Sequence, residues 1–138
     1  MSLDAATKVV VVGLGYVGLP LAIALADRGA RVTIYDLSEK AVELVNGGVV
    51  PFLEPGAEPM LRRAIDAGRL HATTSATAVG DAKNIVVVIG TPVDEHLNPD
   101  PNAIPAALSS CSAYFRDGQL LVLRSTVYPG VTALVERM

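Results

Sequence analysis

The sequence predicts an α/β fold, a doubly wound parallel sheet with helices on both faces. Short β-branched runs alternate with helix-like segments along the 138 residues, and this alternation is typical of parallel strands joined by helical crossovers. Hydrophobic residues make up 51% of the chain and charged residues 18%, so the chain can bury a core and cover a sheet on both sides. Its length suits one domain, over residues 1–138, and is too short for two.

Three strands and three helices are expected in the first half of the chain. Residues 8–12 form a β-branched run, which favours a buried strand. The helix that follows, over 16–28, tolerates Pro20 in its early turns and stops at Gly29. Ser38 is a suitable N-cap for the second helix. The other elements expected here are strands at 31–35 and 70–73 and helices at 38–46 and 56–67.

Two more strands and two more helices are expected in the second half. They are strands at 84–89 and 119–123, a helix at 104–115, and a last helix opened by Pro129, with a polar loop at 91–101. The last helix has no stop signal before Met138, so we expect an N-terminal fragment whose substrate domain is not included. Numbered in chain order, the strands are expected to lie in the order 3-2-1-4-5.

Charge and cysteine content exclude several classes of protein. The net charge is −3 and no basic run is visible, which argues against nucleic acid and against an anionic membrane as partners. Residues 9–26 are apolar enough to suggest a membrane span, but glycines and Pro20 interrupt them, so we expect a strand and a helix instead.

The single cysteine, Cys111, excludes a disulfide within the chain and fits the cytoplasm. His71 and His96 lie in unrelated segments, so no metal site is expected.

A glycine-rich motif marks the first turn of the expected sheet. Residues 13–18, Gly-Leu-Gly-Tyr-Val-Gly, match the dinucleotide-binding pattern G-x-G-x-x-G, and they follow a strand and open a helix as that pattern requires. Gly13 permits the tight turn, Gly15 lets a pyrophosphate approach the backbone, and Gly18 lets the helix pack closely on the strand. The alternative is that the glycines only allow a tight strand–helix turn.

Two further features favour a Rossmann-type site for NAD. The peptide N–H groups of Tyr16 and Val17, at the positive end of a helix dipole, are natural donors to a diphosphate. Asp36 ends the second strand, about twenty residues past the loop, where a carboxylate accepts both adenosine ribose hydroxyls and repels a 2′-phosphate. NAD is therefore favoured over NADP. Asp36 also precedes Ser38 and could instead cap the following helix, and the two roles can coexist.

Four segments together resemble the N-terminal domain of the UDP-glucose/GDP-mannose dehydrogenase family. They are residues 13–20, Glu54-Pro55-Gly56, Gly90-Thr91-Pro92 and Ser125-Thr126-Val127. They occur in the family's order and spacing and span nearly the whole chain. The long acidic loop at 94–100 is similar to that of the UDP-N-acetylmannosamine dehydrogenase branch.

The resemblance implies an enzyme that oxidises the C6 alcohol of a UDP-sugar to a carboxylate with two NAD, as in polysaccharide biosynthesis. In the family a cysteine traps the aldehyde as a thiohemiacetal. That cysteine and a lysine lie downstream of this chain, and Cys111 does not occupy their motif. We therefore expect this chain alone to bind dinucleotide without catalysing the oxidation. We also expect it to form the family's homodimer only with the missing downstream segment.

The resemblance also implies a set of cofactor contacts. The counterparts of Tyr16 and Val17 lie at the pyrophosphate, that of Asp36 at the ribose and that of Thr91 at the cofactor. The counterpart of Thr126 lies by the nicotinamide and is thought to position a catalytic water. The candidate cofactor-binding residues are Gly13, Leu14, Gly15, Tyr16, Val17, Gly18, Asp36, Thr91 and Thr126.

The chain departs from the family pattern at two places. Ala41 stands where many members have a basic residue, with Lys40 one position early, and Leu53 replaces the tyrosine beside Glu54.

Two other hypotheses about the function remain open. One is a stand-alone NAD(H)-binding regulatory module, and the other is a Rossmann dehydrogenase of a hydroxyacid or phosphogluconate type. The segments at 54–56 and 125–127 favour the nucleotide-sugar enzyme.

Overall fold

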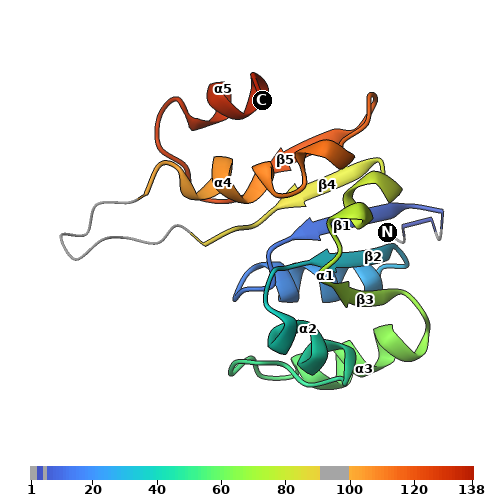
Figure 1. The fold of residues 1–138 in the computed structure, drawn as a ribbon. Coiled ribbons are helices and arrows are strands. Elements are labelled where there is room, and N and C mark those ends of the chain that lie inside the picture. The colour runs from blue at the N-terminus through green and yellow to red at the C-terminus, as the bar shows by residue number, and fades with distance from the viewer. Residues whose placement is uncertain (1–2, 5, 91–99) are drawn as a thin grey trace.

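A five-stranded parallel sheet forms the centre of the molecule in the computed structural model, which describes residues 3–4, 6–90 and 100–138 (Figure 1). The strand order is β3-β2-β1-β4-β5 and all neighbours run parallel, which confirms the predicted order and the doubly wound fold. The strands are β1 Lys8–Val12, β2 Arg31–Tyr35, β3 Leu70–Thr73, β4 Asn84–Val87 and β5 Leu120–Leu123.

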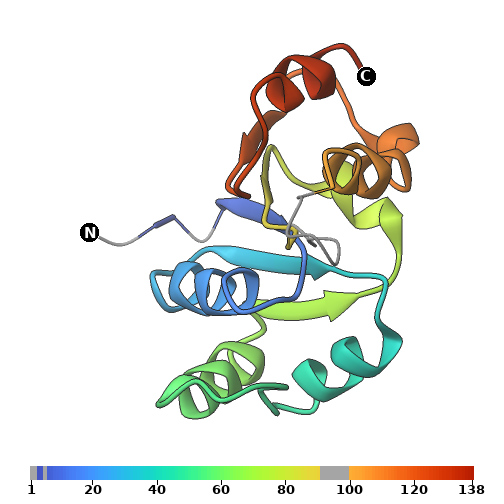
Figure 2. The same cartoon turned by 90° about the vertical axis from the view of Figure 1, so that its left-hand side faces the viewer.

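Helices divide between the two faces of the sheet. One core cluster joins β1, β2 and β3 to α1, α2 and α3, and the other joins β1 and β4 to α4 and α5. Figure 2 shows α2 and α3 towards the β3 end of the sheet and α4 and α5 towards the β5 end. The helices are α1 Gly18–Asp27, α2 Glu39–Asn46, α3 Ala57–Asp66, α4 Ala103–Ser109 and α5 Val131–Glu136, with short 3-10 helices η1 Ala76–Asp81 and η2 Ser112–Tyr114.

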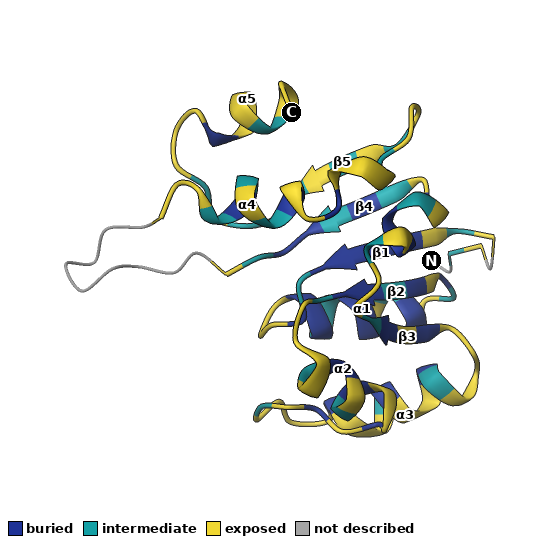
Figure 3. Ribbon diagram, in the orientation of Figure 1, coloured by how far each residue is buried: buried dark blue, intermediate teal, exposed yellow. Residues whose placement is uncertain are grey.

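The central strand β1 is buried on both faces (Figure 3). Val9 and Val11 belong to one core cluster, and Val10 and Val12 belong to the other. Successive side chains of a strand point to opposite faces, so four valines in a row can serve both cores at once. The carboxyl end of β1, from which the glycine motif departs, is therefore held in place by packing on both sides.

The helix expected over 104–115 is shorter in the structure. α4 ends at Ser109, and η2 follows it. The hydroxyl of Ser109 donates to the carbonyl oxygen of Pro105 at 2.8 Å, and that of Ser110 donates to Ala107 at 2.6 Å. Such bonds compete with the hydrogen bonds of a continuing helix. The prediction was therefore wrong for the second half of this segment.

Other boundaries move by a few residues. α1 begins at Gly18 rather than residue 16, because Val17 is its N-cap. β4 ends at Val87 rather than residue 89, and the N–H of Ile89 donates to Ser125 Oγ at 2.8 Å. The short helix η1 was not expected from the sequence.

Within the described residues, no helix combines the length and the apolar character needed to cross a membrane. Residues 9–26, which could suggest such a span, form most of β1, the glycine turn and most of α1.

Candidate functional site

Two glycines of the motif are required by the packing of the loop itself. Gly13 has φ +113°, and a Cβ there would run into the carbonyl oxygen of Val88, which directly follows the neighbouring strand β4. A Cβ on Gly18 would run into the carbonyl oxygen of Gly13. Gly13 thus allows the tight turn, and Gly18 allows α1 to start close behind it, as the sequence predicts.

Gly15 is different, because nothing in the protein requires a glycine there. It is exposed, and its φ lies outside the left-handed range. Apart from its two chain neighbours, no atom of the described residues lies within 4 Å of the position of a Cβ. A tight turn alone explains Gly13 and Gly18 but leaves Gly15 unexplained. The open space above its backbone fits the close approach of a pyrophosphate.

Free peptide donors border this space at the start of α1. Val17 is the N-cap, and no side chain caps the helix. In the described part of the chain, the N–H groups of Tyr16 and Val17 have no protein acceptor. Unpaired N–H groups at the positive end of a helix form a site for an anion.

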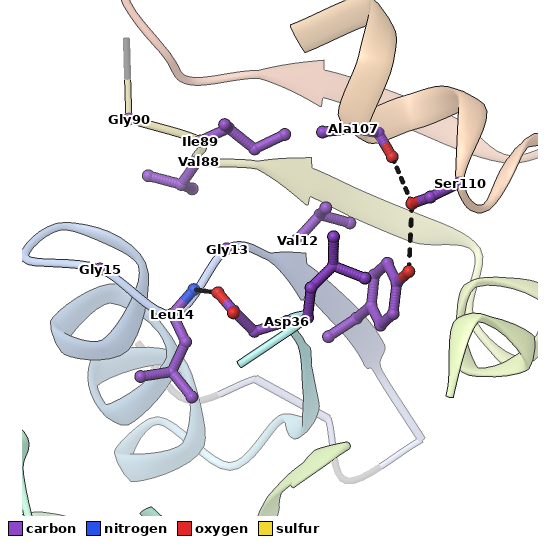
Figure 4. Close-up of a pocket in the computed structure, with 12 residues that line it drawn as sticks. Val12, Gly13, Leu14, Gly15, Asp36, Val88, Ile89, Gly90, Ala107 and Ser110 are labelled. Atoms are coloured by element: carbon purple, nitrogen blue, oxygen red, sulfur yellow. Dashed lines mark hydrogen bonds between the residues drawn. The ribbon is translucent and has the colours of Figure 1, made fainter. Parts of the chain in front are cut away.

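The carboxylate of Asp36 lies directly after β2 and faces the glycine loop (Figure 4). Its Oδ2 accepts a hydrogen bond from the N–H of Leu14 at 2.7 Å, and its Oδ1 accepts one from the N–H of Ser38 at 2.8 Å. The N-cap of α2 is Ser38, whose Oγ accepts from the N–H of Ala41 at 3.3 Å. Asp36 therefore supports the start of α2 without being its N-cap, and it also reaches the loop that a cofactor would contact.

A cavity of about 270 Å³ opens beside Asp36 at the carboxyl ends of the strands. The sheet order places β1 between β2 and β4, so the connections from β1 and β4 diverge at this edge. Ligands of open α/β sheets bind at such a switch point. The cavity is lined by Val12, Gly13, Leu14, Gly15, Tyr35, Asp36, Leu37, Val88, Ile89, Gly90, Ala107 and Ser110.

The structure brings some of the predicted site residues together and not others. Gly13, Leu14, Gly15 and Asp36 line this cavity, and Gly18 lies buried behind the loop. Tyr16 and Val17 are exposed at the start of α1, and Thr126 is exposed beyond the end of β5; these three do not line the cavity. Thr91, like Asp94, Glu95 and His96, lies outside the described residues.

The lining from α4 was missed by the sequence analysis. Ala107 and Ser110 face the cavity, but small residues in a helix carry no motif. Tyr35 was also missed, although it is adjacent to Asp36. Its position in the strand could have identified Tyr35, since it is the last residue of β2 and precedes Asp36, the residue expected to bind the ribose.

The second family segment contacts the glycine loop through an aromatic pair. The rings of Tyr16 and Phe52 lie with their centroids 4.6 Å apart and their planes tilted by 39°. Glu54 and Leu53 are exposed beside this pair. Gly56 has φ +79° and forms the N-cap of α3, so the glycine of this segment has a local structural role.

Cys111 lies in the core on the α4 side of the sheet and is fully buried. Burial raises the pKa of its thiol, and the Sγ donates to the carbonyl oxygen of Leu108 at 3.4 Å. A buried thiol of this kind is a poor nucleophile.

Two solved structures share this fold closely. The chain matches a ternary complex of GDP-mannose dehydrogenase from Pseudomonas aeruginosa with a TM-score of 0.85 and 33% identity over 91% of the chain. It matches the UDP-D-ManNAc dehydrogenase of Pyrococcus horikoshii with a TM-score of 0.88 and 28% identity over 95% of the chain. In each case the match covers only 30% or 31% of the solved chain.

Curated sequences give the same result. The UDP-N-acetyl-D-mannosamine dehydrogenase of Salmonella typhimurium is 33% identical over 91% of the chain, and the UDP-glucose 6-dehydrogenase of Pseudomonas aeruginosa is 33% identical over 95%. The chain spans 29% of the length of either relative. A family model described as the UDP-glucose/GDP-mannose dehydrogenase family, NAD binding domain, matches residues 7–138. The chain therefore belongs to the UDP-glucose/GDP-mannose dehydrogenase family and carries its NAD-binding domain.

Proposed function

We propose that residues 1–138 are the cofactor domain of a nucleotide-sugar 6-dehydrogenase, which oxidises the C6 alcohol of a UDP-sugar to a carboxylate with two NAD. The observation that carries the cofactor site is the open space at Gly15. Next to it in the chain are the N–H groups of Tyr16 and Val17, which have no acceptor among the described residues, and the N–H of Leu14, which the Asp36 carboxylate binds. The names of the curated relatives support the substrate class.

In this proposal the pyrophosphate of NAD lies over Gly15. The N–H groups of Tyr16 and Val17 donate to its oxygens, and the dipole of α1 favours its negative charge. Each carboxylate oxygen of Asp36 accepts one hydrogen bond from the protein and has further lone pairs for the adenosine ribose hydroxyls. A 2′-phosphate at the same place would meet the carboxylate charge, so NADPH should bind more weakly than NADH.

The nicotinamide end of the cofactor is assigned to the other side of the cavity. Gly90, which precedes Thr91 in the sequence, lines the cavity, and Thr126 is exposed beyond the carboxyl end of the neighbouring strand β5. We assign these two threonines to the nicotinamide side, with Thr126 near the water that the reaction consumes. The chemistry that NAD would supply there is the acceptance of a hydride.

The remaining parts of the reaction are assigned to the rest of such an enzyme. Cys111 is buried in the core and has a raised pKa, so it does not serve as the nucleophile that traps the aldehyde. We propose that the nucleophile, the sugar site and the dimer interface belong to the part of the relatives that this chain does not match. A chain with an unpaired thiol fits a reducing compartment such as the cytoplasm.

A titration with NADH and NADPH, followed by the fluorescence of the reduced nicotinamide, tests the cofactor site. We expect saturable binding of NADH. The affinity for NADPH should be lower by about ten-fold or more, because unfavourable charge contacts of this kind cost over 1 kcal/mol. Equal binding of both would contradict the role of Asp36, and binding of neither would contradict the site. NAD reduction by this chain with a UDP-sugar would contradict the assignment of the nucleophile to the rest of the enzyme.

A further inference from the structure

Two hydroxyl groups in contact with each other belong to the lining of the cavity beside Asp36. Tyr35 is the last residue of β2, is 3% exposed and belongs to the core on the α4 side. Ser110 directly follows α4 and is exposed. Both residues line the cavity, and the Oη of Tyr35 lies 3.1 Å from the Oγ of Ser110 (Figure 4).

The positions of the protons in this pair follow from the carbonyl oxygen of Ala107. A carbonyl oxygen can only accept, so the Oγ of Ser110, 2.6 Å away, donates its single proton to it. The hydrogen bond between the two hydroxyls must therefore use the proton of Tyr35. Both oxygens keep free lone pairs, and neither has a proton left. The two hydroxyls thus present only hydrogen-bond acceptors to a ligand.

The pair lies where the base of a bound dinucleotide would extend. With the ribose at Asp36, the base leaves the ribose on the side away from the pyrophosphate and the glycine loop. Leu37 and Ala107, which offer apolar surface to a planar ring, line the same cavity as Tyr35 and Ser110. Adenine has a 6-amino group on its edge, and this group can only donate.

We propose that Tyr35 and Ser110 are specificity-determining residues for the base of the dinucleotide: they accept a hydrogen bond from the 6-amino group of adenine and disfavour a purine with a 6-oxo group. This inference rests on the proposed cofactor site. A 6-oxo oxygen would face oxygen lone pairs and would have a partner only if Tyr35 turned its proton away from Ser110, or Ser110 turned its proton away from Ala107. Either outcome loses one hydrogen bond, which corresponds to about ten-fold in affinity.

The test compares NADH with reduced nicotinamide hypoxanthine dinucleotide, which differs from NADH in the 6-oxo group of its base. Both are followed by nicotinamide fluorescence with the 138-residue chain. We expect the unmodified chain to bind NADH about ten-fold more tightly. Tyr35→Phe and Ser110→Ala should each reduce the ratio of the two affinities to about three-fold or less, chiefly by weakening the binding of NADH.

Asp36→Ala is the matched control, because it removes the proposed ribose contact that both dinucleotides share. It should weaken both ligands by the same factor and leave their ratio unchanged. Equal affinity of the unmodified chain for both dinucleotides, or an unchanged ratio in Ser110→Ala, would overturn the inference while leaving the cofactor site intact. Binding of neither dinucleotide would overturn the cofactor site and this inference with it. Ser110 is exposed, so its variant gives an answer even if Tyr35→Phe does not fold.

Discussion

The carboxylate of Asp36 accepts a hydrogen bond of 2.7 Å from the peptide N–H of Leu14, which precedes it by 22 positions in the chain. This bond joins the loop after β1 to the end of β2, and it fixes one carboxylate oxygen against the glycine turn. A second bond from the N–H of Ser38 fixes the other oxygen. The carboxylate is therefore oriented before any ligand arrives, which lowers the entropy lost on binding.

Asp36→Asn separates the charge of this group from its shape. The amide can keep one oxygen towards the N–H of Leu14, so the fold should change little. The negative charge is lost, and with it the strong acceptor for the ribose hydroxyls and the repulsion of a 2′-phosphate. We expect NADH affinity to fall by about ten-fold and the preference over NADPH to shrink. Fluorescence titrations of both cofactors measure this, and an unchanged NADH affinity would restrict Asp36 to its role beside Ser38.

Gly15→Ala and Gly18→Ala separate the binding role of the motif from its packing role. A methyl group at Gly15 meets no atom of the described residues beyond its chain neighbours, but one at Gly18 runs into the carbonyl oxygen of Gly13. Gly18→Ala should lower the free energy of unfolding by about 1–3 kcal/mol, as overpacking does. Gly15→Ala should leave it within about 0.5 kcal/mol and should weaken NADH binding by about ten-fold or more, since the methyl group would occupy the space of the pyrophosphate.

Urea unfolding followed by circular dichroism, together with an NADH titration, measures both effects. If Gly15→Ala binds NADH as the unmodified chain does, the open space at this position is not the pyrophosphate site. If Gly18→Ala is fully stable, the turn can shift enough to accept a side chain, and the packing role of that glycine is wrong.

The parts of the site that could be predicted are those set by local sequence. The glycine loop and Asp36 follow β-branched strands, and the backbone geometry of a strand–turn–helix unit fixes which residues reach the carboxyl edge. Tyr35 and Ser110 meet across 75 positions of the chain. No spacing rule connects them, because their contact depends on where α4 ends and on where that end lies relative to the end of β2.

The end of α4 shows the same limit at the level of the fold. Apolar spacing in the sequence favours a helix to residue 115, but serine hydroxyls at Ser109 and Ser110 bond back to carbonyl oxygens and the helix stops. The strand order could be predicted because crossover connections between parallel strands have few solutions.

Asn46 protects the outer edge of the sheet. Its side-chain amide donates to the carbonyl oxygen of Ala72 at 2.9 Å and accepts from the N–H of the same residue at 2.8 Å. It therefore satisfies the two backbone groups of the edge strand β3 at that position, as a further strand would. Asn46→Ala should lower the free energy of unfolding by about 1–3 kcal/mol, because both groups lose their partner.

Urea unfolding of Asn46→Ala, with Glu43→Ala as its control, measures this contribution. Glu43 is an exposed residue of the same helix, so its substitution should change stability by less than about 0.5 kcal/mol. Equal stability of the two variants would mean that water replaces the amide of Asn46 without loss.

Cys111 should make stability depend on pH in the alkaline range. Burial raises the pKa of its thiol in the folded chain, so the unfolded chain loses this proton first as the pH rises. The contribution of the thiol to the free energy of unfolding is fully present below the ordinary cysteine pKa of about 8.5. It is lost progressively as the pH rises above that value. We expect Tm to fall more steeply above this pH in the unmodified chain than in Cys111→Ala. Parallel Tm profiles of the two chains would show that the thiol has the same pKa in both states.

The same burial should protect Cys111 from alkylation. The thiolate is the reactive form, and in the folded chain it is both disfavoured and inaccessible, since the side chain is 0% exposed. Iodoacetamide at neutral pH should therefore label the native chain far more slowly than the urea-unfolded chain, as followed by intact mass. Rapid labelling of the native chain would show that α4 opens readily, and because Ser110 lies next to Cys111, the wall of the proposed base site would then open with it.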